Sequence, residues 1–392
     1  MPKRFINETA PAIVNVSLTP AHRVRPEVLR APQPRRTPQA NKASFYRPEL
    51  DCLRFFAFLA VFVHHTLPKD YDFYVSHHLP RFLANIPYAG AFGVDLFFCL
   101  SSYLITELLL REKDKTGHLN VKAFYVRRML RIWPLYFSFV LFAYGLTFIV
   151  PTERFSMAQL FMFLFLMGNW AELFGGIESC VAPLWSVSIE EQFYLLWPLV
   201  VRKASRKQIM QICFGMIGVA LVWRSFIQTH LNAPHLMIWN GTFSHLDTIS
   251  YGILVSVIGV TDKIPGWKRI GFALAGVTAW VFAASLRERG DAMMALVALG
   301  SVAILRAGIG LDLKQRYLVR LGMVSYGLYV YHEFFLNRFN QILPNTHGWG
   351  FITWWVLSLG STMLVALVSY RFLESPFLKL KEKFAVVKSR PV

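Results

Sequence analysis

The chain has 392 residues, of which 55% are hydrophobic and only 16% are charged, and its mean hydropathy is +0.40. Apolar runs long enough to cross a bilayer recur along most of its length, which excludes an ordinary soluble domain. The net charge of +18 is spread over several short loops, a distribution that argues against nucleic-acid binding. We therefore predict an all-α polytopic membrane protein.

Residues 1–47 differ in composition from the rest of the chain. They are rich in Pro, Arg, Asn and Ala, hold nine Lys or Arg residues, and show no helical periodicity. No apolar core of a signal peptide follows Met1. We expect a disordered, basic cytosolic tail that is attracted to anionic lipid.

Ten membrane spans are expected from the apolar runs, followed by a basic cytosolic tail at 378–392. The spans are 50–67, 88–110, 133–150, 184–201, 208–228, 243–259, 269–286, 291–306, 320–337 and 350–372, within a transmembrane domain at 48–377. The apolar stretch 157–170 is short for a crossing, and we expect it to be re-entrant or interfacial. This arrangement places 32 Lys/Arg on one side and six on the other, which predicts that both termini are cytosolic.

The first predicted span carries two ionisable side chains on one face. At roughly 100° per residue, eleven steps bring His65 to within about 20° of Arg54, roughly 16 Å along the axis, and Asp51 falls near the same stripe. His64 points about 80° away from that stripe. Because charged groups in lipid are costly and usually line a functional cavity, we take His65 as the working imidazole.

Polar residues in the second and third spans leave two interpretations open. Asp95 and Ser101 are either interhelical hydrogen-bond partners or functional groups. Arg128 and Arg131 share a face at the cytosolic end of the third span, as topology signals and lipid anchors or as forks for phosphate. In the second case Trp133 and Tyr136 could stack on an aromatic base.

The segment PLWSVSIEEQFYLLWP (183–198) is the most specific stretch of the sequence. It sets Glu190 and Glu191 among aromatic residues, and a buried acid needs a partner such as Arg54 or the Arg128/Arg131 pair. Further polar groups stand near later spans, among them Asp247 and His332; for His332 a structural and a catalytic role both remain open. Arg371 and Glu374, three residues apart, are expected to form a structural ion pair. The four cysteines have no spacing that favours a metal or a disulfide.

Taken in chain order, these segments resemble the acyltransferase-3 family of integral membrane acyltransferases, which includes bacterial O-antigen and exopolysaccharide O-acetylases. The resemblance covers roughly 45–377 and rests on LDCLRFFAFLAVFVHH, GVDLFFCLSSYLI, RRMLRIWPLY, LWSVSIEEQFYLLWP, LDTISYG, VSYGLYVYHE and SYRFLESPF. The family pattern of Arg, ten residues and His falls on Arg54 and His65. Its Arg-x-x-Arg element falls on Arg128 and Arg131, and its Trp-Ser…Glu block falls on Trp185, Ser186 and Glu190. Cys52 and Ser102 stand where the family commonly has Gly; both are small, so we expect close packing to survive.

The resemblance implies transfer of an acyl group, most often acetyl, from acyl-CoA to a hydroxyl of a cell-surface or lipid-linked carbohydrate such as lipopolysaccharide. It implies a bacterial cytoplasmic (inner) membrane protein with lipid around it, acyl-CoA as donor substrate, and neither a permanently bound cofactor nor a metal. Arg128 and Arg131 would hold CoA phosphates, with Trp133 and Tyr136 beside them. His65 would act as general base or transient acyl carrier, oriented by Arg54 or Glu190. Substrate or structural support is expected from Asp51, Asp95, Ser101, Trp185, Ser186, Glu191, Tyr194, Asp247 and His332.

Two further expectations concern partners and rivals. Some relatives carry an extra extracytoplasmic SGNH-type domain, so a second transfer step in this chain would need a partner protein. A glycolipid or polysaccharide transporter or flippase is the main alternative, since it too needs charges along a path through the membrane. Such folds often show two related halves, and we see no such internal symmetry.

Overall fold

The computed structural model describes residues 45–231, 234–260, 264–312, 316–343 and 348–385. These residues form helices joined by short connections, with one isolated bridge between Arg154 and Glu178 and no strand. The predicted N-terminal tail lies outside the described residues apart from 45–47, as does 386–392 of the predicted C-terminal tail. The predicted boundary at 377/378 falls inside a helix, because the chain stays helical to Phe384.

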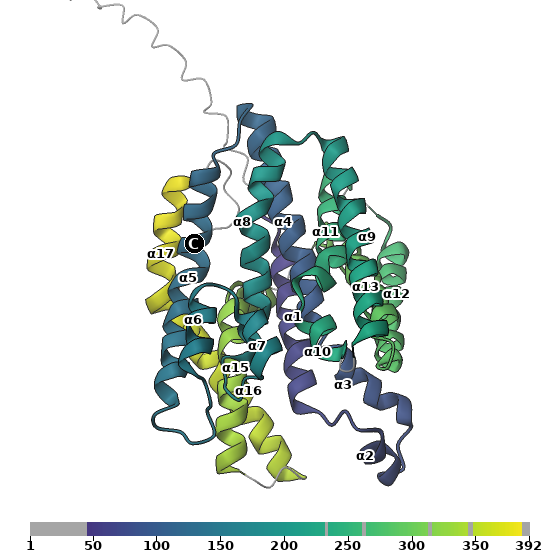
Figure 1. Cartoon of the computed structure of the whole chain (residues 1–392), viewed down its shortest axis with the longest axis vertical. Coiled ribbons are helices and arrows are strands. Elements are labelled where there is room, and N and C mark those ends of the chain that lie inside the picture. Colours follow the sequence, from purple (N-terminus) through teal and green to yellow (C-terminus); the bar gives the residue numbers. More distant parts are fainter. Residues whose placement is uncertain (1–44, 232–233, 261–263, 313–315, 344–347, 386–392) are drawn as a thin grey trace, which may run out of the picture. The chain divides into compact units, whose positions relative to one another are not determined.

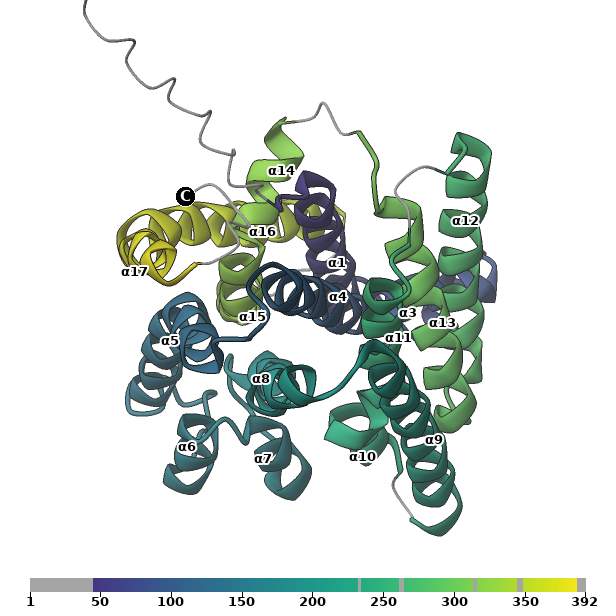
Figure 2. The same ribbon diagram turned by 90° about the horizontal axis from the view of Figure 1, so that it is seen from above.

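Two long helices near the N-terminus of the described region lie at the centre of the helical domain. Figure 2 shows α1 (Pro48–Thr66) and α4 (Gly93–Thr116) between two groups of helices, with α15 (Ser325–Ile342) beside them. One group holds α5 (Val121–Leu146), α6 (Met157–Leu164), α7 (Gly168–Gly175) and α8 (Trp185–Lys203). The other holds α9 (Arg206–His230), α11 (Leu246–Val257), α12 (Gly266–Ala283) and α13 (Gly290–Gly308).

The remaining helices are shorter or complete the C-terminal end. They are α2 (Tyr71–Ser76), α3 (Asn85–Gly90), α10 (Pro234–Asn240), α14 (Arg316–Met323), α16 (Trp349–Ser369) and α17 (Ser375–Lys381). A π-helical turn, Tyr370–Glu374, joins α16 to α17. Single 3₁₀ turns lie at Arg81–Ala84, Ala182–Leu184, Thr242–His245, Ala284–Leu286 and Glu382–Phe384.

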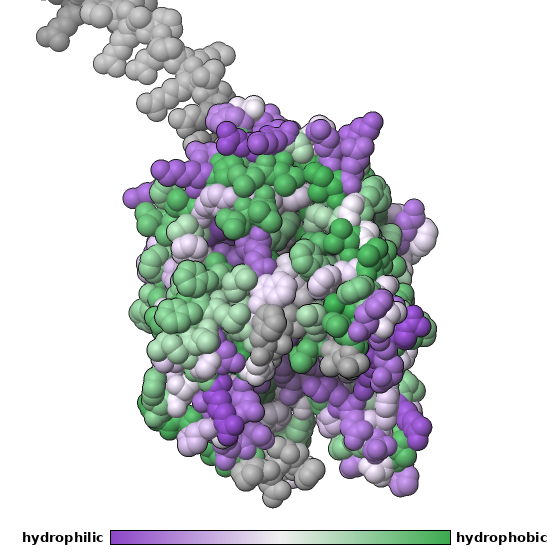
Figure 3. All heavy atoms as spheres, viewed as in Figure 1, coloured by the Kyte–Doolittle hydropathy of each residue, from purple (hydrophilic) through white to green (hydrophobic). Residues whose placement is uncertain are grey.

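Six helical stretches of the described chain are long and apolar enough to cross a membrane. They are Arg81–Thr116, Val121–Leu146, Arg206–His230, Gly266–Leu286, Gly290–Gly308 and Trp349–Phe384. Apolar side chains are exposed along the sides of the helices, as Val222 on α9 and Leu274 on α12, and green surface covers the middle of Figure 3. The chain is an integral all-α membrane protein. The count of ten crossings and the cytosolic termini stay predictions.

The stretch predicted to be re-entrant or interfacial is broken into two short helices. α6 begins at a capping box of Ser156 and Gln159 and spans eight residues, about 12 Å, well short of a bilayer. Leu166 then takes a left-handed conformation (φ 59°), which ends the helix before α7. This geometry agrees with the prediction that 157–170 is no full crossing.

The basic segments that were predicted to lie on one side do meet at one end of the domain. Lys113 Nζ donates to the carbonyl oxygens of Val201 and Ala204, both at 2.9 Å, and Arg206 pairs with Asp114 at 2.7 Å. This end is uppermost in Figure 1. The connection that the predicted spans 88–110 and 133–150 leave between them is too long, since α4 runs to Thr116 and α5 begins at Val121. Lys, Arg and Glu are good helix formers, so the helices continue beyond their apolar parts.

Candidate active site

A central cavity of about 80 Å³ gathers four of the charged residues that the sequence singles out. Its walls come from α1, α4, α5, α8 and α15. The predicted residues that line it are Arg54, Ser101, Arg128, Arg131, Ser186, Glu190 and Tyr194. Three guanidinium groups therefore face one lining carboxylate, and the cavity is basic.

Three of the four charged groups that line the central cavity, Arg54, Arg128 and Glu190, have a defined neighbour. Arg54 Nη1 donates to Asp51 Oδ1 at 3.2 Å, and the Tyr194 hydroxyl donates to Glu190 Oε2 at 2.8 Å. The Arg128 guanidinium lies 5.5 Å from the ring centre of Tyr194. The partner of Arg54 is thus Asp51, one turn away on the same helix, and the partner of Glu190 is a tyrosine.

His65 lies in a second cavity, which we call the histidine cavity. Its Nδ1 is 3.2 Å from Oε2 of Glu333 on α15, within ion-pair distance though without the alignment of a hydrogen bond. Burial lowers the pKa of nearby Lys69, and the Glu333 carboxylate opposes that shift. His64 donates instead to the carbonyl of Pro87 at 3.0 Å. The two adjacent imidazoles thus point to different partners, in agreement with their predicted directions.

A third imidazole lies directly behind the His65–Glu333 pair. His332 is fully buried and donates from Nδ1 to the carbonyl oxygen of Tyr329 at 2.6 Å. Its Nε2 lies 4.0 Å from Glu333 Oε2 and has no hydrogen-bond partner among the described residues. The ligand atoms of His65, His332 and Glu333 lie within 4.8 Å of one another, close enough to hold a cation. The predicted absence of a metal stays a prediction.

The two cavities have no lining residue in common in the described chain. The rings of Phe58, Tyr329 and His332 lie between them, and we call these three side chains the aromatic septum. The ring of His332 lies 6.1 Å from that of Phe58, 5.5 Å from that of Tyr329 and 5.2 Å from that of His65. The prediction that Arg54 or Glu190 contacts His65 is therefore wrong for this conformation. Eleven residues of helix move His65 roughly 16 Å along α1, far beyond the reach of a direct contact with Arg54.

Two of the predicted donor-binding residues lie outside both cavities. Tyr136 is fully buried, and its hydroxyl donates to the Phe163 carbonyl at 3.0 Å. Trp133 donates from Nε1 to Glu191 Oε2 at 3.1 Å. The structure thus leaves neither ring facing a cavity where a base could stack, and both hold the α5–α6–α8 packing together.

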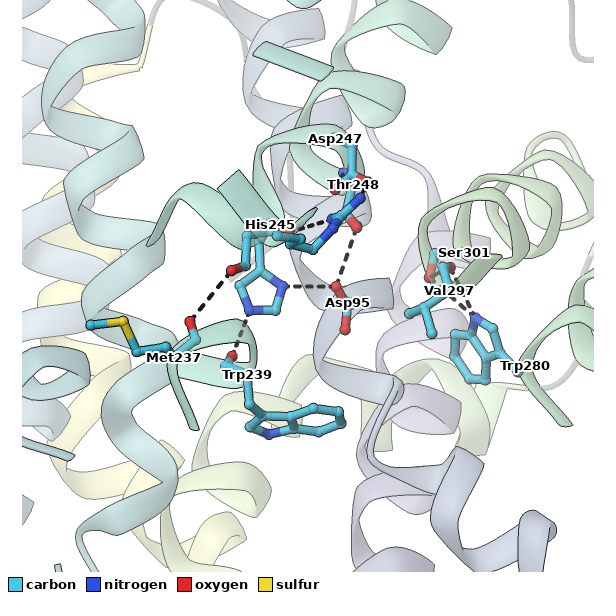
Figure 4. A network of polar contacts seen from close by, with 11 residues as sticks. Asp95, Met237, Trp239, His245, Asp247, Thr248, Trp280, Val297 and Ser301 are labelled. Carbon is cyan, nitrogen blue, oxygen red and sulfur yellow. Dashed lines mark hydrogen bonds and ion pairs between the residues drawn. The ribbon is translucent and has the colours of Figure 1, made fainter. Parts of the chain in front are cut away.

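Other predicted residues belong to a buried polar network around α11 (Figure 4). His245 Nδ1 donates to Asp95 Oδ1 at 2.9 Å and its Nε2 donates to the Trp239 carbonyl at 2.8 Å. Asp247 Oδ2 accepts from Arg224 at 2.6 Å. Both ring nitrogens of His245 therefore have an oxygen partner. Asp95 and Asp247 are therefore structural, and Trp185 covers this network with its ring 5.8 Å from that of His245.

Three features of the site were missed from the sequence. Glu333 stood beside His332 without an assigned role, although a carboxylate next to an intramembrane histidine is itself a signal. Arg224 was given no partner in the sequence analysis. Because a charged side chain inside a span needs a counter-charge, Asp247 could have been proposed as its partner. The predicted ion pair between Arg371 and Glu374 does not form: Arg371 is exposed and Glu374 is buried. The π-helical turn changes the spacing that would have brought them together.

The buried cations, the imidazole beside a carboxylate and the long apolar helices define the class: an integral membrane protein with a basic internal cavity. Residues 47–371 match the family model of the acyltransferase domain (Acyl_transf_3), and the chain belongs to the acyltransferase-3 family, as the sequence motifs predict.

Similar proteins with curated names are O-acetyltransferases. The chain is 26% identical over 370 residues to the putative O-acetyltransferase SAS0844 of Staphylococcus aureus (strain MSSA476), covering 85% of this chain and 58% of that protein. It is also 26% identical over 370 residues to the peptidoglycan O-acetyltransferase OatA of Listeria monocytogenes, covering 85% and 56%. The chain thus spans less than three fifths of the length of these relatives. No solved structure gives a significant match.

Proposed function

We propose that this chain is an O-acyltransferase of the bacterial cytoplasmic membrane. It moves an acetyl group from acetyl-CoA to a hydroxyl of a cell-surface or lipid-linked carbohydrate. The observation that carries the proposal is the arrangement along α1, with Arg54 in a basic cavity and His65 against Glu333 in a second one.

The donor end of the reaction rests on the central cavity. Arg128 and Arg131 line it near the basic end of the domain, and neither has an ion pair within the described chain. Guanidinium groups match phosphate oxygens in geometry and charge. Arg128 and Arg131 therefore suit the phosphates of a CoA thioester. The donor enters from the basic end, and its pantetheine arm, which carries the thioester, enters first.

The chemical step rests on His65. Glu333 Oε2 lies within ion-pair distance of Nδ1, so the carboxylate is placed to stabilise the imidazolium that forms when Nε2 acts as base. Nε2 takes the proton of the acceptor hydroxyl while the oxygen attacks the thioester carbonyl. The new C–O bond forms as the C–S bond breaks, and the proton passes to the leaving thiolate.

Transfer between the two cavities requires the septum to open. Phe58, Tyr329 and His332 stand between the basic cavity and His65, so the thioester reaches His65 when these side chains move apart. An acyl-imidazole on His65 is the alternative to direct attack: the acyl group is then carried by the ring itself and passed to an acceptor in the histidine cavity.

The acceptor is proposed on chemistry and on the names of relatives. The histidine cavity is open and carries hydroxyl-binding amides, with Asn337 and Asn340 in its wall. A carbohydrate fits such a wall. The peptidoglycan named for the Listeria relative is one candidate, and lipid-linked saccharides are another.

Purified protein and acetyl-CoA test the proposal directly. His65→Ala should lower the rate of acetyl transfer to a carbohydrate acceptor by roughly 10²–10⁴-fold, the usual contribution of a general base. His64→Asn is the matched control, because the asparagine amide can still donate to Pro87. The rate is measured as thiol release that depends on acceptor. Wild-type turnover in the His65 variant would remove His65 from the reaction, and transport of a glycolipid without thiol release would favour the flippase alternative.

A further inference from the structure

A small recess at the basic end of the domain opens beside the central cavity. It has a volume of about 50 Å³ and shares Leu104, Arg128 and Arg131 with the central cavity. Its other walls are Leu108, Glu112, Arg127, Lys381 and Ala385. We call it the basic recess. A ligand could therefore lie in the recess and reach into the central cavity past the two shared arginines.

The charges of the basic recess do not balance. Four cationic side chains line it against one carboxylate, Glu112. Glu112 is already engaged, because it pairs with Arg127 at 3.1 Å and accepts from the Asn120 backbone at 3.0 Å. Arg128, Arg131 and Lys381 are left without an ion pair or a hydrogen-bond acceptor in the part of the chain that the structure describes.

Arg127 holds the position of the segment that carries Lys381. Its Nη1 donates to the carbonyl oxygen of Phe384 at 2.8 Å, while its Nη2 holds Glu112. Lys381, three residues before Phe384, is thereby kept against α5 and turned into the recess. Three like charges around one buried hollow are unfavourable unless an anion joins them. The arrangement is built for such an anion.

We infer that Lys381, with Arg128 and Arg131, forms a subsite for the ribose 3′-phosphate of the acyl donor. This inference rests on the proposed function and adds a specificity-determining residue that lies beyond the matched acyltransferase domain. A phosphate monoester carries up to two charges and accepts several charge-assisted bonds. With the 3′-phosphate in the recess, the rest of the donor passes Arg128 and Arg131 towards the central cavity.

The test compares acetyl-CoA with acetyl-3′-dephospho-CoA on the full-length protein in nanodiscs of neutral lipid. For the wild type we expect the KM of the dephospho donor to be roughly 10–100-fold higher, the effect of losing charge-assisted hydrogen bonds. Lys381→Ala and Lys381→Gln should raise the KM of acetyl-CoA towards that value, while the KM of the dephospho donor and kcat stay unchanged. Lys379→Ala, an exposed lysine on the same helix, should match the wild type.

Four outcomes separate the explanations. Equal KM values for the two donors in the wild type, or an equal effect of Lys381→Ala on both, would overturn the inference. It is also overturned if phosphatidylglycerol in the nanodiscs raises activity through Lys381 without donor discrimination, which would identify a lipid phosphate. Binding of adenosine 3′,5′-bisphosphate is measured by calorimetry alongside turnover. If that binding depends on Lys381 but no acetyl transfer occurs, the subsite holds and the proposed function fails.

Discussion

At the scale of single residues, α1 carries Arg54 and His65 into two different cavities. Arg54 is fixed by Asp51 in the central cavity, and His65 is placed against Glu333 in the histidine cavity. Glu333 has one oxygen close to two imidazoles, so it stabilises positive charge on whichever ring takes a proton. Its expected role is to position His65 rather than to bind the donor.

Glu333→Gln keeps the size of the side chain and removes its charge. We expect kcat for acetyl transfer to fall by roughly 10²-fold or more, because the imidazolium formed in the reaction loses its counter-charge. The KM for acetyl-CoA should stay near the wild-type value, since the central cavity and the basic recess are untouched. Steady-state kinetics with both substrates measures the two constants separately.

Glu333→Asp provides the control for that prediction. A carboxylate on a shorter side chain should restore part of kcat, whereas a merely structural role would leave both variants equally impaired. A parallel rise in the KM for acetyl-CoA in Glu333→Gln would instead assign Glu333 to the donor site.

Charged residues in apolar segments could be found from the sequence, and the structure brings four of them together. The partner of each charged residue could not be chosen from the sequence. Arg54, Arg128, Arg131 and Glu190 do share one cavity. The partner of His65 could not be chosen from the sequence, because helix geometry gives the direction of a side chain but not which later helix packs against it. The buried position of Tyr136 has the same cause.

At the scale of helices, close contact between α4 and α11 depends on small residues. A Cβ added to Gly252 would lie 2.3 Å from the Cys99 carbonyl oxygen and 2.2 Å from Ser102 Oγ. Ser102 is fully buried in this contact and donates to Cys99 at 3.1 Å. The sequence expectation that a small residue preserves close packing at this position is confirmed.

Gly252→Ala should therefore force α4 and α11 apart and destabilise the protein by about 1–3 kcal/mol. Gly218→Ala in α9 is the matched control, because no atom lies within 4 Å of its added Cβ. That change should be neutral or stabilising by about 0.5–1 kcal/mol, since alanine is the better helix former. Thermal unfolding in detergent compares them; equal melting temperatures would contradict the close contact.

Helices themselves were largely predictable, and their ends were not. Apolar runs located the cores of α9, α12, α13 and α16 to within a few residues. They gave no sign that α5 begins a dozen residues before its apolar part, where the charged turn that holds Arg127 and Arg128 stays helical. Packing against neighbours, rather than hydropathy, continues a helix beyond the lipid.

At the scale of the whole molecule, the protein is polarised from end to end. The basic recess, the central cavity and the histidine cavity follow one another along α1, α4 and α5, from the end that holds Lys113 and Arg206 to the end that holds His65. By the positive-inside rule we expect the first end to face the cytosol. This orientation would bring donor and acceptor from opposite sides.

Cysteine labelling of intact cells tests that orientation. The four native cysteines are free and buried, so an impermeant maleimide should leave them unmodified. Ser76→Cys, exposed on α2, should react in intact cells, and Lys115→Cys, exposed at the end of α4, only after the membrane is opened. Labelling of Lys115→Cys from outside would invert the predicted topology.

The contact between Arg127 and the Phe384 carbonyl ties the residues after the matched domain to α5. The recognised domain ends at residue 371, yet Lys381 in the wall of the basic recess belongs to α17, which follows that border. A fragment trimmed at that border would retain His65, Glu333 and all three arginines of the central cavity while losing Lys381. Such a fragment should still react with thioesters but accept truncated nucleotides as readily as intact ones, so donor choice can evolve in a few C-terminal residues while the chemistry stays fixed.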